Sequence, residues 1–347
     1  MRVFALALGL SVAGAEAEPS LPQMLRDGFP MWDADHDGML TQEEIDWGLA
    51  SPEVKGPAAA ALAAVYIGLG KATQTNLELP VSLEKAVQAA PQCQEYYRKA
   101  LDLIANTPRV LFTNRVPNLK NFTQRHVGSC WALSSLATLI QRDPAEVAAR
   151  FAARQNGFSF RFDDGSISVS APTDGEIGVG STTGHDGLWS IVFEKAAGER
   201  FIEKGQRPGP PLRAVSGAKS VGMLSALTGH KAERMEFESL REDAAQLNAL
   251  RKALRVAVTQ HRLVTTGRGL NELRVPGLLF DHIFAVLGYD MASDFVTIRD
   301  PHNEEFMPKG GESLENGYRM HEGVFRIRVP EFVRAMSSVS IEQPVHL

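Results

Sequence analysis

The sequence has few cysteines, no long apolar run and no concentration of positive charge. Its 347 residues include only two cysteines, Cys93 and Cys130, which are too few to build a disulfide scaffold. No segment reaches the roughly 20 consecutive apolar residues that a membrane-spanning helix needs. There is no basic run interleaved with aromatic residues, and the formal net charge is -5. Composition therefore gives no sign of nucleic-acid binding. The chain is long enough to bury a sizeable core in one large or two modest domains.

Residues 1–17 have the pattern of a secretory signal peptide. Arg2 supplies the positive charge, Val3 to Val12 form a short apolar stretch, and the small residues from Ala13 to Ala17 offer two cleavage sites. No cysteine follows that would carry a lipid anchor. We therefore expect a secreted or periplasmic protein, in a compartment that is more oxidising and richer in Ca2+ than the cytosol. The alternative is an apolar N-terminus that is not removed.

A short acidic segment, DADHDGMLTQEE, runs from Asp33 to Glu44. Calcium prefers a cluster of hard oxygens, a glycine at the sharp turn and a bidentate carboxylate that closes the loop. The segment resembles an EF-hand at every ligand position. The ligands so implied are Asp33, Asp35, Asp37, the Met39 carbonyl, Thr41 through water, and Glu44, with Gly38 at the turn. We expect Ca2+ at this loop, within an EF-hand segment at 18–52, and we find no second loop. The alternative is an acidic surface loop that binds nothing.

Residues 53–108 are rich in alanine and have the apolar spacing of helices. One predicted helix begins after Ser82 and runs through Cys93 towards Ile104. We expect a helical linker or pro-like region here, to which the sequence assigns no function. Cys93 is expected to be a buried apolar residue, and a disulfide with Cys130 is the alternative.

The chain is organised around the stretch QRHVGSCWALSSLATLI, from Gln124 to Ile140. Gly128 and Ser129 form a turn that places Cys130 in the first turn of an apolar helix. The partial positive charge and free N–H groups of a helix N-terminus favour the thiolate, the nucleophilic form of cysteine. The side-chain amide of Gln124 is expected to donate to an oxyanion beside the Cys130 backbone N–H. The pattern predicts a nucleophilic cysteine, and the alternative is a small core residue.

A second segment of interest reads DHIFAVLGYDMASDFVTIRDPHN. Two apolar strands in it, His282 to Gly288 and Asp294 to Asp300, flank a turn. Antiparallel pairing brings the histidine that begins the first strand close to the aspartate that ends the second. A nucleophilic cysteine needs an imidazole base and a third group that orients the ring. We therefore expect Cys130, His282 and Asp300 to form one catalytic set.

These motifs together resemble the papain-like cysteine peptidases, and the string GSCWALSSL around Cys130 is most similar to the calpain branch. A β-hairpin predicted between Phe158 and Val169 follows the cysteine helix, as it does in the calpains. Three later stretches fit the resemblance in the same order, at 187–196 (LW…EKA), 227–229 (LTG) and 323–332 (a strand and a Pro-initiated helix). The resemblance covers about Arg109 to Glu342 and implies a calpain-like cysteine protease core at 109–343.

The resemblance implies an α+β fold with a papain-like, two-lobed core. A helical lobe would carry Cys130, and a β-rich lobe would carry His282 and Asp300, with the cleft between them. A mostly helical N-terminal region with one EF-hand would precede this core.

The sequence departs from the calpain pattern R-N-P-W-G, because Arg299 to Asn303 read RDPHN. Asp300 stands where the orienting asparagine is expected. An aspartate accepts the imidazole N–H as well as an amide does, and it stabilises the imidazolium more strongly. His302 replaces the tryptophan that shields the pair. Asn303 is the alternative orienting residue, in a shifted register.

The favoured hypothesis is a secreted calpain-like cysteine endopeptidase that acts on protein or peptide substrates and binds Ca2+ at the EF-hand. Cys130 would attack the peptide carbonyl, His282 would act as base and then as acid, Asp300 would hold the ring, and Gln124 would bind the oxyanion. One alternative is transglutaminase-like acyl transfer to an amine, which uses the same residue types. The other is a catalytically inactive Ca2+-binding scaffold. The sequence predicts no nucleic-acid partner and no membrane span.

Overall fold

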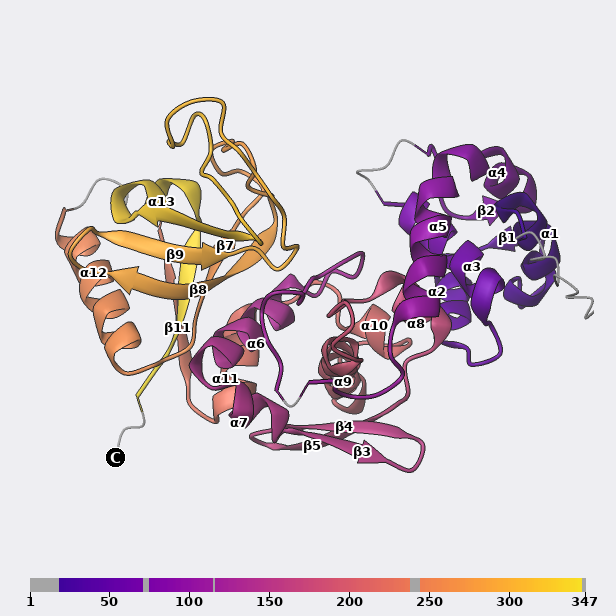
Figure 1. Cartoon of the computed structure of the whole chain (residues 1–347), viewed down its shortest axis with the longest axis horizontal. Helices are drawn as coiled ribbons and strands as arrows, with labels where there is room; N and C mark the ends of the chain where they lie inside the picture. The colour runs from indigo at the N-terminus through magenta and orange to yellow at the C-terminus, as the bar shows by residue number, and fades with distance from the viewer. Residues whose placement is uncertain (1–18, 71–74, 115, 238–243, 345–347) are drawn as a thin grey trace, which may run out of the picture.

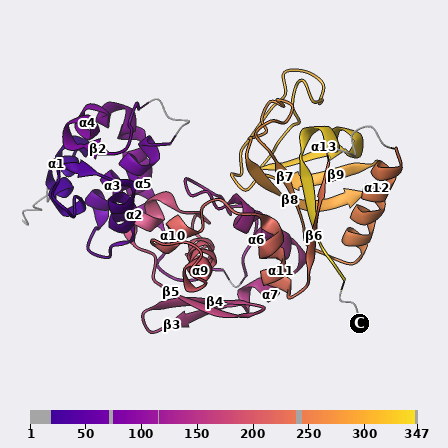
Figure 2. The same ribbon diagram turned by 180° about the vertical axis from the view of Figure 1, so that it is seen from behind.

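A computed structural model of the chain describes residues 19–70, 75–114, 116–237 and 244–344, arranged in three consecutive parts (Figure 1). The predicted signal peptide at 1–17 lies outside the described residues. A helical unit comes first, a mixed lobe that begins with the Cys130 helix follows, and a β-rich lobe ends the chain. Figures 1 and 2 show the helical unit and the β-rich lobe on opposite sides of the mixed lobe.

The helical unit contains two helix–loop–helix pairs followed by a fifth helix. Its elements are α1 (Leu21–Trp32), β1 (Met39–Leu40), α2 (Gln42–Ala50), α3 (Gly56–Gly68), β2 (Val81–Ser82), α4 (Leu83–Gln88) and α5 (Ala90–Asn106). The two-residue strands pair antiparallel, with Met39 opposite Ser82 and Leu40 opposite Val81. The acidic loop is therefore joined to a second helix–loop–helix, which the sequence did not reveal. The described residues of the segments 18–52 and 53–108, which the sequence predicts as separate, are packed together in this unit.

Alanine determines how the helical unit packs. The buried run from Ala59 to Ala64 lies along α3, and small side chains let neighbouring helices approach closely. The predicted single helix from Ser82 to Ile104 was wrong in one respect, because it divides into α4 and α5 at Ala89. Pro91 lies in the first turn of α5, where a ring that lacks an N–H is tolerated.

The mixed lobe is built around one buried helix. Its elements are α6 (Cys130–Arg142), α7 (Pro144–Ala148), β3 (Phe151–Arg154), β4 (Gly157–Phe162), β5 (Gly165–Ser170), α8 (Asp174–Val179), α9 (Trp189–Glu203), α10 (Pro211–Ala214) and α11 (Ser220–Thr228). Every residue of α6 from Trp131 to Ile140 is buried, as its apolar sequence predicts. The predicted hairpin is confirmed as β4 and β5, with Phe160 opposite Ile167.

The β-rich lobe contains an antiparallel sheet whose described strands run in the order β10-β9-β8-β7-β11-β6. Its elements are β6 (Ala232–Glu236), α12 (Ala244–Thr259), β7 (Val264–Arg268), β8 (His282–Asp290), β9 (Phe295–Arg299), β10 (Val324–Arg328), α13 (Val329–Ala335) and β11 (Ser338–Glu342). Both helices pack on the sheet over a core of their own. The molecule is therefore of the α+β class.

The Cys130 helix joins the two lobes. It packs against β8 and β7, and the hydroxyl of Ser134 donates to the Ile283 carbonyl at 2.8 Å. Ile283 follows His282 directly, so this bond fixes the start of β8 beside the first turns of α6.

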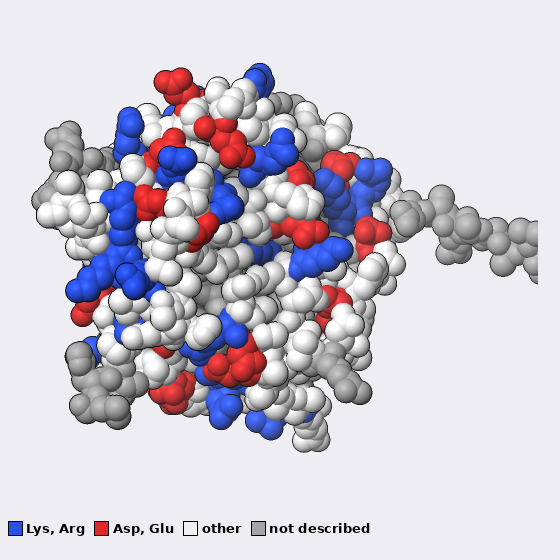
Figure 3. All heavy atoms as spheres, turned by 60° about the vertical axis from the view of Figure 1, so that its left-hand side comes forward, with Lys and Arg blue, Asp and Glu red and all other residues white. Residues whose placement is uncertain are grey.

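Two broader features of the described part of the chain bear on its environment. None of its helices is long and apolar enough to cross a membrane. Figure 3 turns the side of the β-rich lobe forward and shows acidic and basic side chains interspersed across that face. The net negative charge is therefore not gathered into a field of one sign there.

Candidate active site

Cys130 is the first residue of α6, as the sequence predicts. The turn before it is held from both sides. The Ser129 N–H donates to the Val127 carbonyl at 2.8 Å, and the Gly217 N–H donates to the Gly128 carbonyl at 2.8 Å. Cys130 is partly exposed and reduced, whereas the residues after it are buried. Its thiol thus stands at the open end of a buried helix.

The predicted partners of the thiol are brought together in the β-rich lobe. Nε2 of His282 lies 3.1 Å from Oδ1 of Asp300. Asp300 is fully buried and His282 is 6% exposed. The His302 backbone N–H also donates to Oδ1 of Asp300, at 2.8 Å. Because Nε2 faces the carboxylate, Nδ1 is the nitrogen left to serve the thiol.

The strand register explains how His282 reaches Asp300. Ala285 pairs with Arg299, and a bulge between Val286 and Gly288 shifts the register further along. β9 ends at Arg299, so Asp300 lies just beyond the ladder and turns its carboxylate towards the imidazole. The predicted proximity of the two residues is confirmed, although they are not directly opposed in the sheet.

The charges around the His282 ring favour its protonated form. Burial alone would lower the pKa of His282, but the hydrogen bond to Asp300 and the interaction with the Cys130 thiol outweigh it and raise the pKa from 6.5 to about 9. The pKa of Asp300 is lowered, because the hydrogen bond and charge of His282 outweigh the effect of burial. At neutral pH the ring is therefore an imidazolium between two groups that stabilise it as a cation.

His302 covers the His282 ring. The two imidazoles stack with centroids 5.0 Å apart and planes inclined by 20°. Burial lowers the pKa of His302, and so does the positive charge of His282, against the opposing effect of Asp300. His302 therefore provides a flat, uncharged cover over His282 near neutral pH.

Asn303 does not orient the imidazole. Its Nδ2 donates to the Lys120 carbonyl at 3.1 Å, and its Oδ1 accepts from Arg299 at 3.3 Å. Between the two alternatives left by the sequence, the geometry places Asp300 on the ring.

Arg299 joins the segment before Gln124 to the segment around Asp300, a role that the sequence did not suggest. Its Nη2 donates to the Leu119 carbonyl at 3.0 Å and to the Phe122 carbonyl. Its guanidinium carbon lies 5.5 Å from the centroid of the Phe122 ring. Burial lowers the pKa of Arg299 to about 10, against the opposing charge of Asp300. The loop before Gln124 is thereby fixed to the end of β9.

Gln124 is held beside the turn that precedes Cys130. Its backbone N–H donates to the Pro301 carbonyl at 2.8 Å, and its side-chain Nε2 donates to the Val127 carbonyl at 2.9 Å. Since a side-chain amide has two N–H groups, the bond to Val127 leaves one as a donor. The Oε1 atom is buried and has no hydrogen-bond partner among the described residues. The position fits the predicted oxyanion donor.

A buried carboxyl group, that of Glu194, stabilises the turn before Cys130. Its Oε1 accepts from the Ser129 hydroxyl at 2.5 Å, and its Oε2 accepts from the Ser181 N–H at 2.7 Å. Burial raises the pKa of Glu194, outweighing both hydrogen bonds. Glu194 lies within the predicted LW…EKA helix, but a pattern of helical spacing gives no indication that this residue contacts the one preceding Cys130.

The acidic loop between α1 and α2 brings three predicted ligands together. Carboxylate oxygens of Asp33, Asp35 and Asp37 lie within 4.8 Å of one another. Gly38 has a φ of 85°, in the left-handed region that favours glycine. Two backbone N–H groups donate to the Asp33 carboxylate, from Asp37 at 3.2 Å and from Gly38 at 2.9 Å. The loop is therefore folded with these carboxylates facing a common point.

Glu44 stands slightly apart from that cluster. Its Oε1 accepts from the Ala34 N–H at 2.8 Å, and its Oε2 accepts from the N–H and hydroxyl of Thr41 at 2.9 and 2.8 Å. Burial is the largest single effect and raises the pKa of Glu44, but the hydrogen bonds from Thr41 and Ala34 together outweigh it and lower the pKa. Met39 lies in β1, so its carbonyl belongs to the paired strand. The residues present offer the hard oxygens that Ca2+ prefers.

Cys93 is remote from this chemistry. It is buried in α5 and unpaired, and burial raises the pKa of its thiol to about 11. The structure therefore holds Cys93 and Cys130 as separate thiols, without the alternative disulfide.

A comparison of the sequence with models of protein families finds no match, and a comparison with curated proteins finds no match either.

Proposed function

We propose that this protein is a calpain-like cysteine endopeptidase that hydrolyses peptide bonds in protein substrates. The observation that carries the proposal is the grouping of Cys130, His282 and Asp300, in which a thiol at a helix N-terminus meets a buried imidazole held by a carboxylate. These are the parts that nucleophilic catalysis by cysteine needs.

In the proposed mechanism, the thiolate of Cys130 attacks the scissile carbonyl carbon. The negative charge that develops on the carbonyl oxygen is stabilised by the Cys130 backbone N–H and the second N–H of Gln124. The His282 imidazolium then transfers a proton to the leaving amine, which departs as the new N-terminus of one product. The neutral ring next takes a proton from a water molecule, and attack of that water on the thioester releases the acyl group as a carboxylic acid and restores the thiolate and the imidazolium. Asp300 keeps the ring oriented through both steps.

The proposal includes a Ca2+ site at the EF-hand-like loop. Asp33, Asp35 and Asp37 would hold the ion through their carboxylates, the Met39 carbonyl would add an oxygen, and Glu44 would close the loop after releasing Thr41 and Ala34. The ion would supply structural rigidity to a loop that otherwise concentrates negative charge. With the signal-peptide pattern at 1–17, this supports a secreted or periplasmic enzyme.

The proposal is tested by incubating reduced protein with a denatured protein substrate, with and without Ca2+. Cleavage is expected for the native chain and for a Cys93→Ala variant, and none for Cys130→Ala. A primary amine included in the reaction distinguishes the acyl-transfer alternative. Incorporation of the amine without cleavage would replace the peptidase by a transglutaminase-like enzyme, and an inert Cys130 in both assays would leave a Ca2+-binding scaffold.

A further inference from the structure

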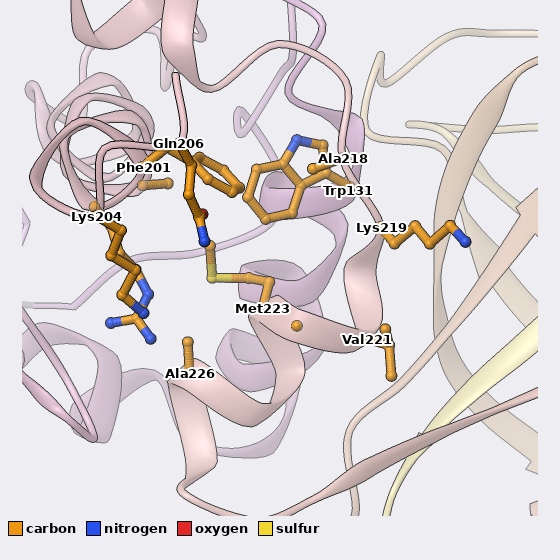
Figure 4. Close-up of a pocket in the computed structure, with 12 residues that line it drawn as sticks. Trp131, Phe201, Lys204, Gln206, Ala218, Lys219, Val221, Met223 and Ala226 are labelled. Atoms are coloured by element: carbon orange, nitrogen blue, oxygen red, sulfur yellow. The ribbon is translucent and has the colours of Figure 1, made fainter. Parts of the chain in front are cut away.

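A cavity of about 330 Å³ lies in the mixed lobe between α9 and α11 (Figure 4). This volume is at the lower end of the roughly 300–1,000 Å³ typical of small-molecule sites. None of the catalytic residues lines it, and its residues have no part in the proposed hydrolysis. Its walls nevertheless include Trp131, which follows the nucleophile in the chain.

The cavity has a rigid apolar interior. Figure 4 shows the rings of Trp131 and Phe201 on one side and the Met223 side chain on the other. The two rings meet edge to face, with centroids 5.6 Å apart and planes inclined by 63°. The indole N–H of Trp131 donates to the Val215 carbonyl at 2.9 Å. This hydrogen bond satisfies the only polar atom of the indole and fixes the wall in place.

One edge of the cavity is positively charged. Its lining includes Arg200, Lys204 and Lys219, but no aspartate or glutamate. Arg200 and Lys204 share a single carboxylate, that of Asp164, at 2.5 and 3.8 Å. Among the side chains that line the cavity or bond its cations, two cations therefore face one anion at the α9 edge.

Some polar side chains of the cavity lie at its α9 edge, and one points away from it. Figure 4 shows Lys204 at the α9 edge and the Gln206 amide between Phe201 and Met223, whereas Lys219 extends away from the cavity. A bound molecule would therefore meet apolar surface in the interior and hydrogen-bond donors and positive charge at one edge.

We propose that this cavity is a binding site for a small amphipathic carboxylate, such as a medium-chain fatty acid anion. The apolar tail lies between Trp131 and Met223, where it removes apolar surface from water. The carboxylate lies at the α9 edge, where it accepts from Lys204 and the Gln206 amide and balances the excess positive charge. The proposal does not depend on peptidase activity.

Gly222 provides a variant that blocks the cavity with little disturbance elsewhere. It lines the cavity from α11, and a Cβ added to it would meet no other atom within 4 Å. Gly222→Leu thus places a side chain in open space. Gly222→Ala is its matched control, since it adds only a methyl group at the same helical position.

The binding experiment uses full-length Cys130→Ala protein, so that hydrolysis has no effect, and measures octanoate binding by calorimetry. One molecule of octanoate is expected to bind per chain, and octylamine, which has the opposite charge, is expected not to bind. Gly222→Leu and Lys204→Glu are each expected to weaken octanoate by at least about tenfold. Gly222→Ala and the distant exposed Lys85→Glu are expected to leave the affinity unchanged.

Three results would overturn the proposal: no octanoate binding, equal binding of octylamine, or undiminished affinity in both Gly222→Leu and Lys204→Glu. Circular dichroism verifies that each variant is folded. If Gly222→Leu does not fold, the decision falls to Lys204→Glu, because Lys204 is exposed and its replacement removes no buried side chain.

Discussion

Replacing Asp300 by asparagine isolates the charge that sustains the His282 imidazolium. Asparagine keeps an oxygen that accepts hydrogen bonds from the His282 ring and from the His302 N–H, so the geometry is preserved. The negative charge is lost. Burial lowers the pKa of His282, and without the Asp300 charge less remains to counteract it, so the pKa of His282 falls.

The size of the effect follows from the site. Raising the pKa of His282 from 6.5 to about 9 corresponds to roughly 3 kcal/mol in favour of the imidazolium, shared between Asp300 and Cys130. Removing a neighbouring opposite charge typically changes a pKa by about 1–3 units. We therefore expect Asp300→Asn to lower the pKa of His282 by at least roughly one unit.

The assay is the pH dependence of peptide cleavage. Protonation of His282 is needed to expel the leaving amine, so activity of the native protein should decline as the pH rises through about 9. In Asp300→Asn the decline should begin at lower pH, while the neutral-pH rate persists. Asn303→Ala is the matched control and should retain the native alkaline limb. The assignment of Asp300 as the orienting residue would be refuted if the alkaline decline in activity kept its native pH in Asp300→Asn and shifted in Asn303→Ala.

Three further predictions concern stability and metal binding. The folded-state pKa of His282 is raised, so the stabilisation that its protonation gives is complete below pH 6.5 and is lost as the pH rises through about 9. The free energy of unfolding measured in urea should therefore decrease by up to about 3 kcal/mol over that window. A free energy of unfolding that does not change with pH would contradict this prediction. Glu194→Ala should cost about 1–3 kcal/mol because it leaves the buried Ser181 N–H without its acceptor and the Ser129 hydroxyl with only the longer contact to the Val127 carbonyl. It should also slow alkylation of Cys130, whereas Glu194→Gln should largely restore both the stability and the rate. Equal behaviour of the two variants would show that the hydrogen bonds are immaterial. Ca2+ should raise the melting temperature of the native chain more than that of Asp37→Ala, which removes a ligand oxygen from the loop, and an equal rise in both would place the metal elsewhere.

The parts of the site that were predicted from sequence are those with strong local signals. The start of α6 is defined by the turn before Cys130 and the apolar run after it, and both signals lie within a few residues of Cys130. Likewise, His282 and Asp300 lie at the ends of two strands joined by a short turn, so pairing alone brings them together.

The parts that were missed depend on contacts between distant segments. Arg299 bonds the Phe122 carbonyl across 177 residues, and Glu194 bonds Ser129 across 65. Nothing in either local sequence specifies these partners, because they are set by how α9 and β9 pack. The same applies to β1 and β2, two-residue strands that are too short to produce an alternating pattern.

The choice between Asp300 and Asn303 as the orienting residue also required the three-dimensional structure. Both residues have side chains that accept a hydrogen bond, and they lie three positions apart in a turn. Only the end of the ladder at Arg299 determines which of them faces the imidazole.

The most direct test of the central claim is covalent trapping of the nucleophile. Reduced native protein is treated with a peptidyl diazomethyl ketone at pH 7, and the modified residue is located by mass spectrometry. One label per chain is expected, on Cys130, with labelling abolished in His282→Ala and unaffected in Cys93→Ala. Labelling of Cys130 at the same rate in His282→Ala, or no labelling of Cys130 in the native protein, would contradict a thiol activated by His282.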